Sequence, residues 1–176
     1  MDTLHVRLFD RHVGDLGIEG EVRSPEDWQF RYAPDYLGAA RPVALSVSLP
    51  LRSEPFVGAV VRNWFGNLLP EGAVREAIAS RLRIPVWDDF ALLADIGGEC
   101  AGAVSIVPPD GPSSTKETPD PARDLEALLA ASGGMAGEGS WALLGTPRRL
   151  SLAGAQDKIA VVRDADGHLR LPAAGE

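Results

Sequence analysis

The residues best suited to binding or catalysis lie in the segment from Arg148 to Lys158, RRLSLAGAQDK. Small residues at positions 153–155 would let the backbone approach a ligand closely, and successive N–H groups of a tight turn can hold phosphate oxygens. Lys158 would add a positive charge, and the only other lysine is Lys116. The segment matches neither of the glycine-rich phosphate consensus motifs, GxxxxGK[ST] and GxGxxG. An ordinary β-turn between apolar strands is therefore the alternative interpretation.

Other familiar catalytic arrangements are missing from the sequence. The histidines are His5, His12 and His168, and none lies three or four residues from another histidine or from Cys100, so the spacing predicts no metal site. No G-x-S-x-G segment is present to supply a hydrolase nucleophile. Cys100 has no adjacent cation in the sequence to stabilise a thiolate, which favours a structural thiol.

The central region carries two polar features within apolar patterns. Asn67 follows the aromatic pair Trp64-Phe65, whose helical spacing predicts a core position, and we expect the Asn67 amide to bond backbone groups in the turn at 70–72. An acidic cluster follows, which we interpret as a solvated helix face rather than a catalytic pair. Its members are Asp88, Asp89, Asp95 and Glu99.

Composition and charge limit the class of protein. Hydrophobic residues make up 45% and charged residues 24%, as in ordinary globular chains. The net charge of −8 disfavours direct contact with the phosphate backbone of DNA or RNA. Neither a membrane-length apolar run nor a signal-peptide core appears, so we expect a cytoplasmic protein that does not contact a membrane.

Hydrophobic periodicity predicts short strands followed by helices. Helical spacing is found over 57–69 and 73–82, and a further helix should begin at Asp88-Asp89 and end at Gly97-Gly98. Alternating apolar residues predict strands near residues 4–9, 11–17, 28–32, 44–49 and 101–107.

The second half of the chain begins with a predicted linker. Residues 108–121, PPDGPSSTKETPDP, contain no large apolar residue, so they predict an extended connection rather than a packed element. Beyond it, apolar runs at 158–162 and 168–171 flank a turn at 164–167 and predict a hairpin. The predicted class is α+β, with a small mostly antiparallel sheet and short helices over residues 1–107, a linker over 108–121, and a second part over 122–176.

Four stretches together resemble the N-terminal part of the HipA-type serine/threonine kinases, the toxins of bacterial type II toxin–antitoxin pairs. They occur in the family's order and span roughly residues 4 to 172. The four stretches are LSVSLPL (45–51), WFGNLLPEG (64–72), FALLADIG with CAGAV (90–97 and 100–104), and LSLAGAQDK (150–158).

The resemblance implies specific roles for the last stretch. It implies that residues 122–176 begin a kinase-like N-lobe, that ATP is the nucleotide, with Mg²⁺, and that Ser151 is an autophosphorylation site. It also implies a DNA-binding antitoxin of the HipB type as partner, indirect contact with DNA, and a cytosolic protein substrate such as an aminoacyl-tRNA synthetase. The residues it assigns to the nucleotide phosphates are Ala153, Gly154, Ala155, Gln156, Asp157 and Lys158.

The catalytic loop of a kinase is absent from the sequence. That loop needs an aspartate with an asparagine five residues later, and the only asparagines, Asn63 and Asn67, follow Gly58 and Arg62 at that spacing. We therefore predict that this chain alone is inactive and contains no catalytic residue. The alternative is a non-catalytic binding module that neutralises or regulates a partner kinase.

Overall fold

A computed structural model of the chain describes residues 2–9, 11–20, 24–99, 103–111, 162–163 and 165–170. The chain divides into two compact units. The first comprises Met1–Leu69 and Trp87–Ser113, and the second comprises Pro70–Val86 and Ser114–Glu176. Within the described parts of both units, no helix has the length and apolar character needed to cross a membrane.

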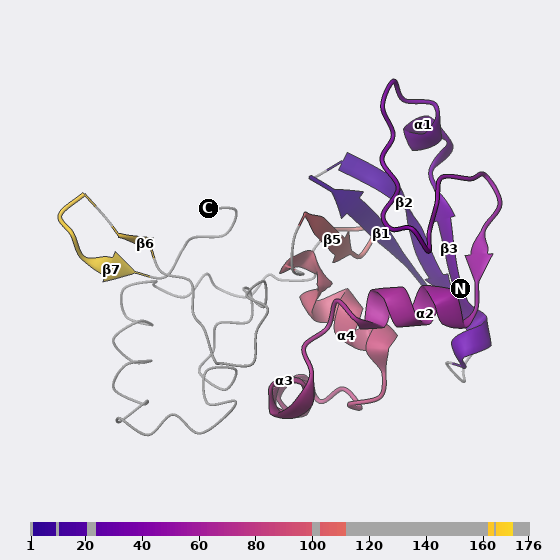
Figure 1. Ribbon diagram of the computed structural model, residues 1–176. Helices are drawn as coiled ribbons and strands as arrows, with labels where there is room; N and C mark the ends of the chain where they lie inside the picture. Colours follow the sequence, from indigo (N-terminus) through magenta and orange to yellow (C-terminus); the bar gives the residue numbers. More distant parts are fainter. Residues whose placement is uncertain are drawn as a thin grey trace. The chain divides into compact units, whose positions relative to one another are not determined.

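The first unit is built on a five-stranded sheet with the strand order β4-β3-β2-β1-β5 (Figure 1). Every neighbouring pair is antiparallel. The N-terminal hairpin of β1 and β2 therefore lies inside the sheet, and β5, the last strand of this unit in the sequence, pairs with β1. The strands are β1 (Asp2–Leu8), β2 (Arg11–Ile18), β3 (Trp28–Tyr32), β4 (Phe56–Val57) and β5 (Val104–Val107).

Apolar side chains occupy one face of this sheet. Leu4 pairs with Leu16, and Leu16 pairs in turn with Phe30, so one apolar row crosses three strands. All three side chains are buried. Because successive residues of a strand face opposite sides, a one-residue slip would expose the whole row, and the burial therefore fixes the register.

Helices α2 (Ala59–Gly66) and α4 (Asp89–Ile96) lie side by side against the apolar face (Figure 1). The ring centroid of Phe65 lies 5.4 Å from that of Phe30, and Phe90 meets Trp28 edge-on at 5.6 Å. The predicted α+β class is thereby confirmed. The short elements of the unit are η1 (Pro25–Asp27), α1 (Pro34–Leu37) and η2 (Gly97–Glu99).

The strand predicted near residues 44–49 is wrong. This segment forms a tight turn in which the Leu49 N–H bonds the Ser46 carbonyl oxygen at 3.1 Å, and Val47 at its apex is fully exposed. Pro50 follows and cannot donate to a ladder. The strand that pairs with β3 is β4, only two residues long, which is too short to show a period in the sequence.

The predicted helix over 57–69 also begins later than its apolar spacing indicates. Val57 belongs to β4, and Gly58 adopts a φ of 81°, a left-handed conformation that separates the strand from α2. Glycine reaches this region without steric cost, so the periodicity of the apolar residues continues across a break in the backbone.

The described part of the second unit contains one helix and one hairpin. The predicted helix over 73–82 is confirmed as α3 (Gly72–Leu82). The predicted hairpin is confirmed over its described residues, where β6 (Val162–Arg163) pairs antiparallel with β7 (Leu169–Arg170). The linker over 108–121 stays a prediction, because most of it lies outside the described residues.

Candidate functional site

The predicted nucleotide-binding residues lie outside the described part of the chain. Ser151 and the stretch from Ala153 to Lys158 fall within 112–161, which the structure does not describe. Their assignment to ATP phosphates therefore stays a prediction. The described residues instead contain three polar arrangements in the first unit and one in the second.

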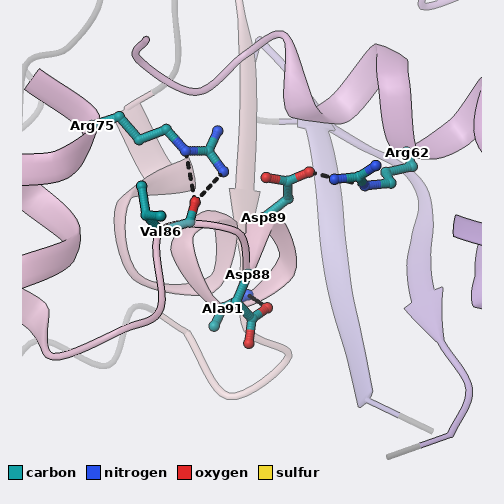
Figure 2. Close-up of polar contacts among 6 residues, drawn as sticks. All are labelled: Arg62, Arg75, Val86, Asp88, Asp89 and Ala91. Atoms are coloured by element: carbon teal, nitrogen blue, oxygen red, sulfur yellow. Dashed lines mark hydrogen bonds and ion pairs between the residues drawn. The ribbon is translucent and has the colours of Figure 1, made fainter. Parts of the chain in front are cut away.

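The first arrangement is an ion pair that joins the two covering helices. Arg62 on α2 donates from Nε to Oδ2 of Asp89 on α4 at 3.1 Å, and Figure 2 shows the two side chains directed toward one another. The Asp89 side chain is 9% exposed, against 37% for Arg62. A Cβ added at Gly66 would lie 3.4 Å from Asp89 Oδ2, so α2 approaches the carboxylate closely.

The interpretation of the acidic cluster as a solvated face is therefore wrong for Asp89. Its neighbour Asp88 is also structural, since its Oδ1 accepts from the Ala91 N–H at 3.0 Å and caps α4 as predicted (Figure 2). Asp95, farther along the helix, is exposed as predicted. The two adjacent aspartates thus have different tasks, one at the helix end and one between helices.

The second unit has its own arginine contact. Arg75 on α3 donates from Nε and Nη2 to the Val86 carbonyl oxygen at 2.9 and 2.7 Å (Figure 2). Both donors of the guanidinium fork converge on a single oxygen. This contact ties the segment that follows α3 back to the helix.

Two tyrosine hydroxyls hold the turn that replaced the predicted fourth strand, and we call them the tyrosine clamp. Tyr32 donates to the Leu49 carbonyl oxygen at 2.6 Å and accepts from the Leu45 N–H at 2.8 Å. Tyr36 donates to the Val43 carbonyl oxygen at 2.9 Å and accepts from the N–H of the same residue at 3.0 Å. Burial raises the pKa of the Tyr32 hydroxyl above its usual value of 10.0.

The clamped turn presents apolar side chains to solvent. Val47 is 100% exposed, and Val43 and Leu51 are partly exposed on either side. The clamp uses the backbone groups that a sheet ladder would have used, so the turn is held in place by side chains of β3 and α1.

The expectations for the aromatic helix have mixed outcomes. Phe65 is buried in the core as predicted. Asn67, however, is exposed and forms the C-cap of α2, where its backbone N–H bonds the Asn63 and Phe65 carbonyl oxygens. An exposed amide can be satisfied by water, so the reason for expecting a bond to the turn at 70–72 does not hold.

The third arrangement in the first unit was missed by sequence spacing. His5 Nδ1 lies 2.7 Å from Asp15 Oδ1, and His12 Nε2 lies 2.9 Å from the same oxygen. The three potential ligand atoms all lie within 4.8 Å of one another. The sequence could have indicated this cluster only through the alternation of apolar residues, which predicts a hairpin in which residues 5 and 15 are neighbours.

Comparison with known proteins assigns this chain to a family. The model of the HipA N-terminal domain matches residues 4–107. Two proteins of Sinorhizobium fredii, both provisionally named kinases, are similar along nearly the whole chain. Y4mE is 37% identical, with 95% of this chain and 37% of the relative covered, and Y4dM is 29% identical, with 98% and 39% covered. The chain thus spans less than two fifths of these relatives.

A solved structure gives the same fold. HipA of Shewanella oneidensis MR-1, determined with HipB and its operator DNA, superposes with a TM-score of 0.62 and 24% identity. The match covers 96% of this chain and 37% of that one.

Proposed function

Because the chain belongs to the HipA N-terminal domain family, matched over residues 4–107, we propose that it is the N-terminal part of a serine/threonine kinase of the HipA toxin type. The observation that carries the proposal is the family match together with the stretch LSLAGAQDK that follows it at 150–158. The relatives, of which this chain covers less than two fifths, bear provisional kinase names, which supports the proposal.

In this proposal the stretch from Ala153 to Lys158 holds the phosphates of ATP. Backbone N–H groups at Gly154 and Ala155 would donate to phosphate oxygens, and the Lys158 ammonium would balance their charge. ATP with Mg²⁺ supplies the transferable phosphoryl group when bound. Autophosphorylation of Ser151 would add about −1.5 to −2 charges beside the loop and oppose ATP binding.

The proposed partner is a DNA-binding antitoxin of the HipB type. The similar Shewanella protein was solved with HipB and operator DNA. The net charge of −8 favours contact with DNA through a partner rather than directly. The proposed substrate is a cytosolic protein such as an aminoacyl-tRNA synthetase, and the chain alone should transfer no phosphate because it lacks the aspartate–asparagine loop.

Calorimetric titration of ATP into the complete gene product tests the phosphate loop. Lys158→Ala removes a charge-assisted contact and should weaken ATP binding by about 10- to 150-fold, from roughly 1.5–3 kcal/mol. Lys116→Ala is the matched control, because it removes the only other lysine of residues 1–176. Equal affinities for both variants and the parent would refute the loop assignment.

A second candidate, a binding module that regulates a partner kinase, is favoured by the clamped turn with its exposed Val47. It predicts that the 176-residue chain, added in trans, lowers the activity of the partner kinase and that Val47→Asp removes this effect. Inhibition that survives Val47→Asp would exclude the turn as the contact surface.

A further inference from the structure

Three potential metal ligands converge on the face of the sheet opposite α2 and α4. His5 and Asp15 are direct partners across β1 and β2, and Asp15 Oδ1 lies within 2.9 Å of a ring nitrogen from each of His5 and His12. Their side chains are 32–44% exposed, so an ion has access from solvent. We call these three residues the hairpin triad.

A β-bulge places His12 in the hairpin triad. In an unbroken strand, residues three apart face opposite sides of the sheet, so His12 and Asp15 would be separated. The register between β1 and β2 shifts at Val6, which pairs with Gly14, and Arg7, which pairs with His12. The extra residue, Val13, is buried, and His12 returns to the face that carries His5 and Asp15. Bulges redirect side chains in this way near binding sites.

We propose that the hairpin triad binds a divalent transition metal ion such as Zn²⁺ through His5 Nδ1, His12 Nε2 and the Asp15 carboxylate. Two imidazoles and a carboxylate are a zinc donor set, and three protein ligands leave a fourth tetrahedral position for water or for a donor group of a partner. Tetrahedral coordination at about 2.0–2.2 Å would place neighbouring ligand atoms roughly 3.3 Å apart. The observed 2.7 and 2.9 Å require outward movements of about half an ångström by partly exposed side chains.

Two arginines share this face with the hairpin triad. Arg31 on β3 pairs with Asp15, and Arg7 lies two residues from His5 and pairs with His12. Their charges oppose a cation, so moderate rather than tight affinity is expected.

Titration of Zn²⁺ into the purified chain tests the proposal. The chain should bind one equivalent at neutral pH, and His5→Gln and His12→Gln should each weaken binding by at least about tenfold. His168→Gln is the matched control, since it removes the remaining histidine and should leave the affinity unchanged. Arg31→Gln should tighten binding, a gain that loss of structure cannot produce.

A second measurement identifies the ligands without mutation. Paramagnetic Co²⁺ should broaden the imidazole proton resonances of His5 and His12 in the parent chain before those of His168. Absence of one-equivalent binding, equal loss in His168→Gln, or loss in Cys100→Ser with the triad variants unaffected would each overturn the proposal.

Discussion

The ion pair between α2 and α4 gives a quantitative test of how this domain is held together. Arg62→Met removes the guanidinium that lies 3.1 Å from Asp89 and keeps the aliphatic length of the side chain. The carboxylate it leaves behind is only 9% exposed. Loss of one partner of a buried pair is costly because the remaining charge then loses part of its compensation.

The expected magnitude follows from distance and exposure. Two charges at this separation interact by about 5 kcal/mol at an effective dielectric constant of about 20. Arg62 is 37% exposed, so water screens part of that attraction, and desolvation of Asp89 offsets more. We expect Arg62→Met to lower the free energy of unfolding by about 2–4 kcal/mol, with a coupling energy of about 1–3 kcal/mol between the two residues.

A double-mutant cycle in urea measures that coupling. It needs the parent, Arg62→Met, Asp89→Asn and the double variant, with unchanged m-values as the check that unfolding stays two-state. Arg52→Met is the control: this exposed arginine bonds local carbonyl oxygens and lies over the Phe56 ring, 3.6 Å from its centroid, and its loss should change stability by no more than about 1 kcal/mol. A coupling energy below about 0.5 kcal/mol would refute the view that the pair holds the helices together.

Four other substitutions test the local geometry. Tyr32→Phe should cost about 1–3 kcal/mol by leaving two backbone groups of the clamped turn unpaired, and should speed proteolysis there; an unchanged cleavage rate would contradict the clamp. Because the folded-state pKa of Tyr32 is raised, parent stability should be complete below pH 10.0 and fall as pH rises above it, less steeply in Tyr32→Phe; equal slopes would contradict this. Gly14→Ala would place a Cβ 2.3 Å from the Arg31 carbonyl oxygen, so circular dichroism should show loss of the native sheet, and a native melt would disprove the close approach. Arg83→Gly should raise the free energy of unfolding by about 1 kcal/mol because Arg83 caps α3 at a φ of 58°, whereas Arg81→Gly within α3 should lower it by a similar amount; the reverse order would exclude a left-handed cap.

The parts of the fold that the sequence predicted are those where one face is buried. Strand β3 alternates cleanly, and β1 does so from Thr3 to Arg7, because every second residue enters the core, whereas the bulge interrupts the alternation in β2. Asp88 marks the start of α4 because a carboxylate at that position accepts from the first turn. Apolar residues also alternate in the sequence of the turn at 44–49, although this segment forms no strand. There Leu49 is buried while the backbone bonds the tyrosine clamp, so tertiary contacts replaced the ladder.

Contacts between distant residues were beyond the reach of local patterns. Asp89 looks solvated beside Asp88, and nothing local marks Arg62, 27 residues earlier, as its partner. Asn67 shows the opposite error, since its position after an aromatic pair indicates burial although the helix ends there and exposes it. Both errors arise because burial depends on where a helix packs, which helical spacing alone leaves open.

The hairpin triad shows why ligand spacing rules fail in sheets. Spacings of three or four residues identify metal ligands on helices and in short loops, where such residues share a side. In a regular strand only residues an even number of positions apart share a face, so His12 and Asp15 would not be expected to bind the same ion. His5 lies beside them only because β1 pairs with β2. Because of the bulge at Val13, His12 and Asp15 share a face although they are three residues apart. Core packing holds the bulge, since Val13 is buried and a side chain at Gly14 would clash with the Arg31 carbonyl oxygen. The geometry of the hairpin triad is therefore set by apolar residues on the opposite face of the sheet. The packing of the core, rather than the spacing of the ligands, is what predicts the site.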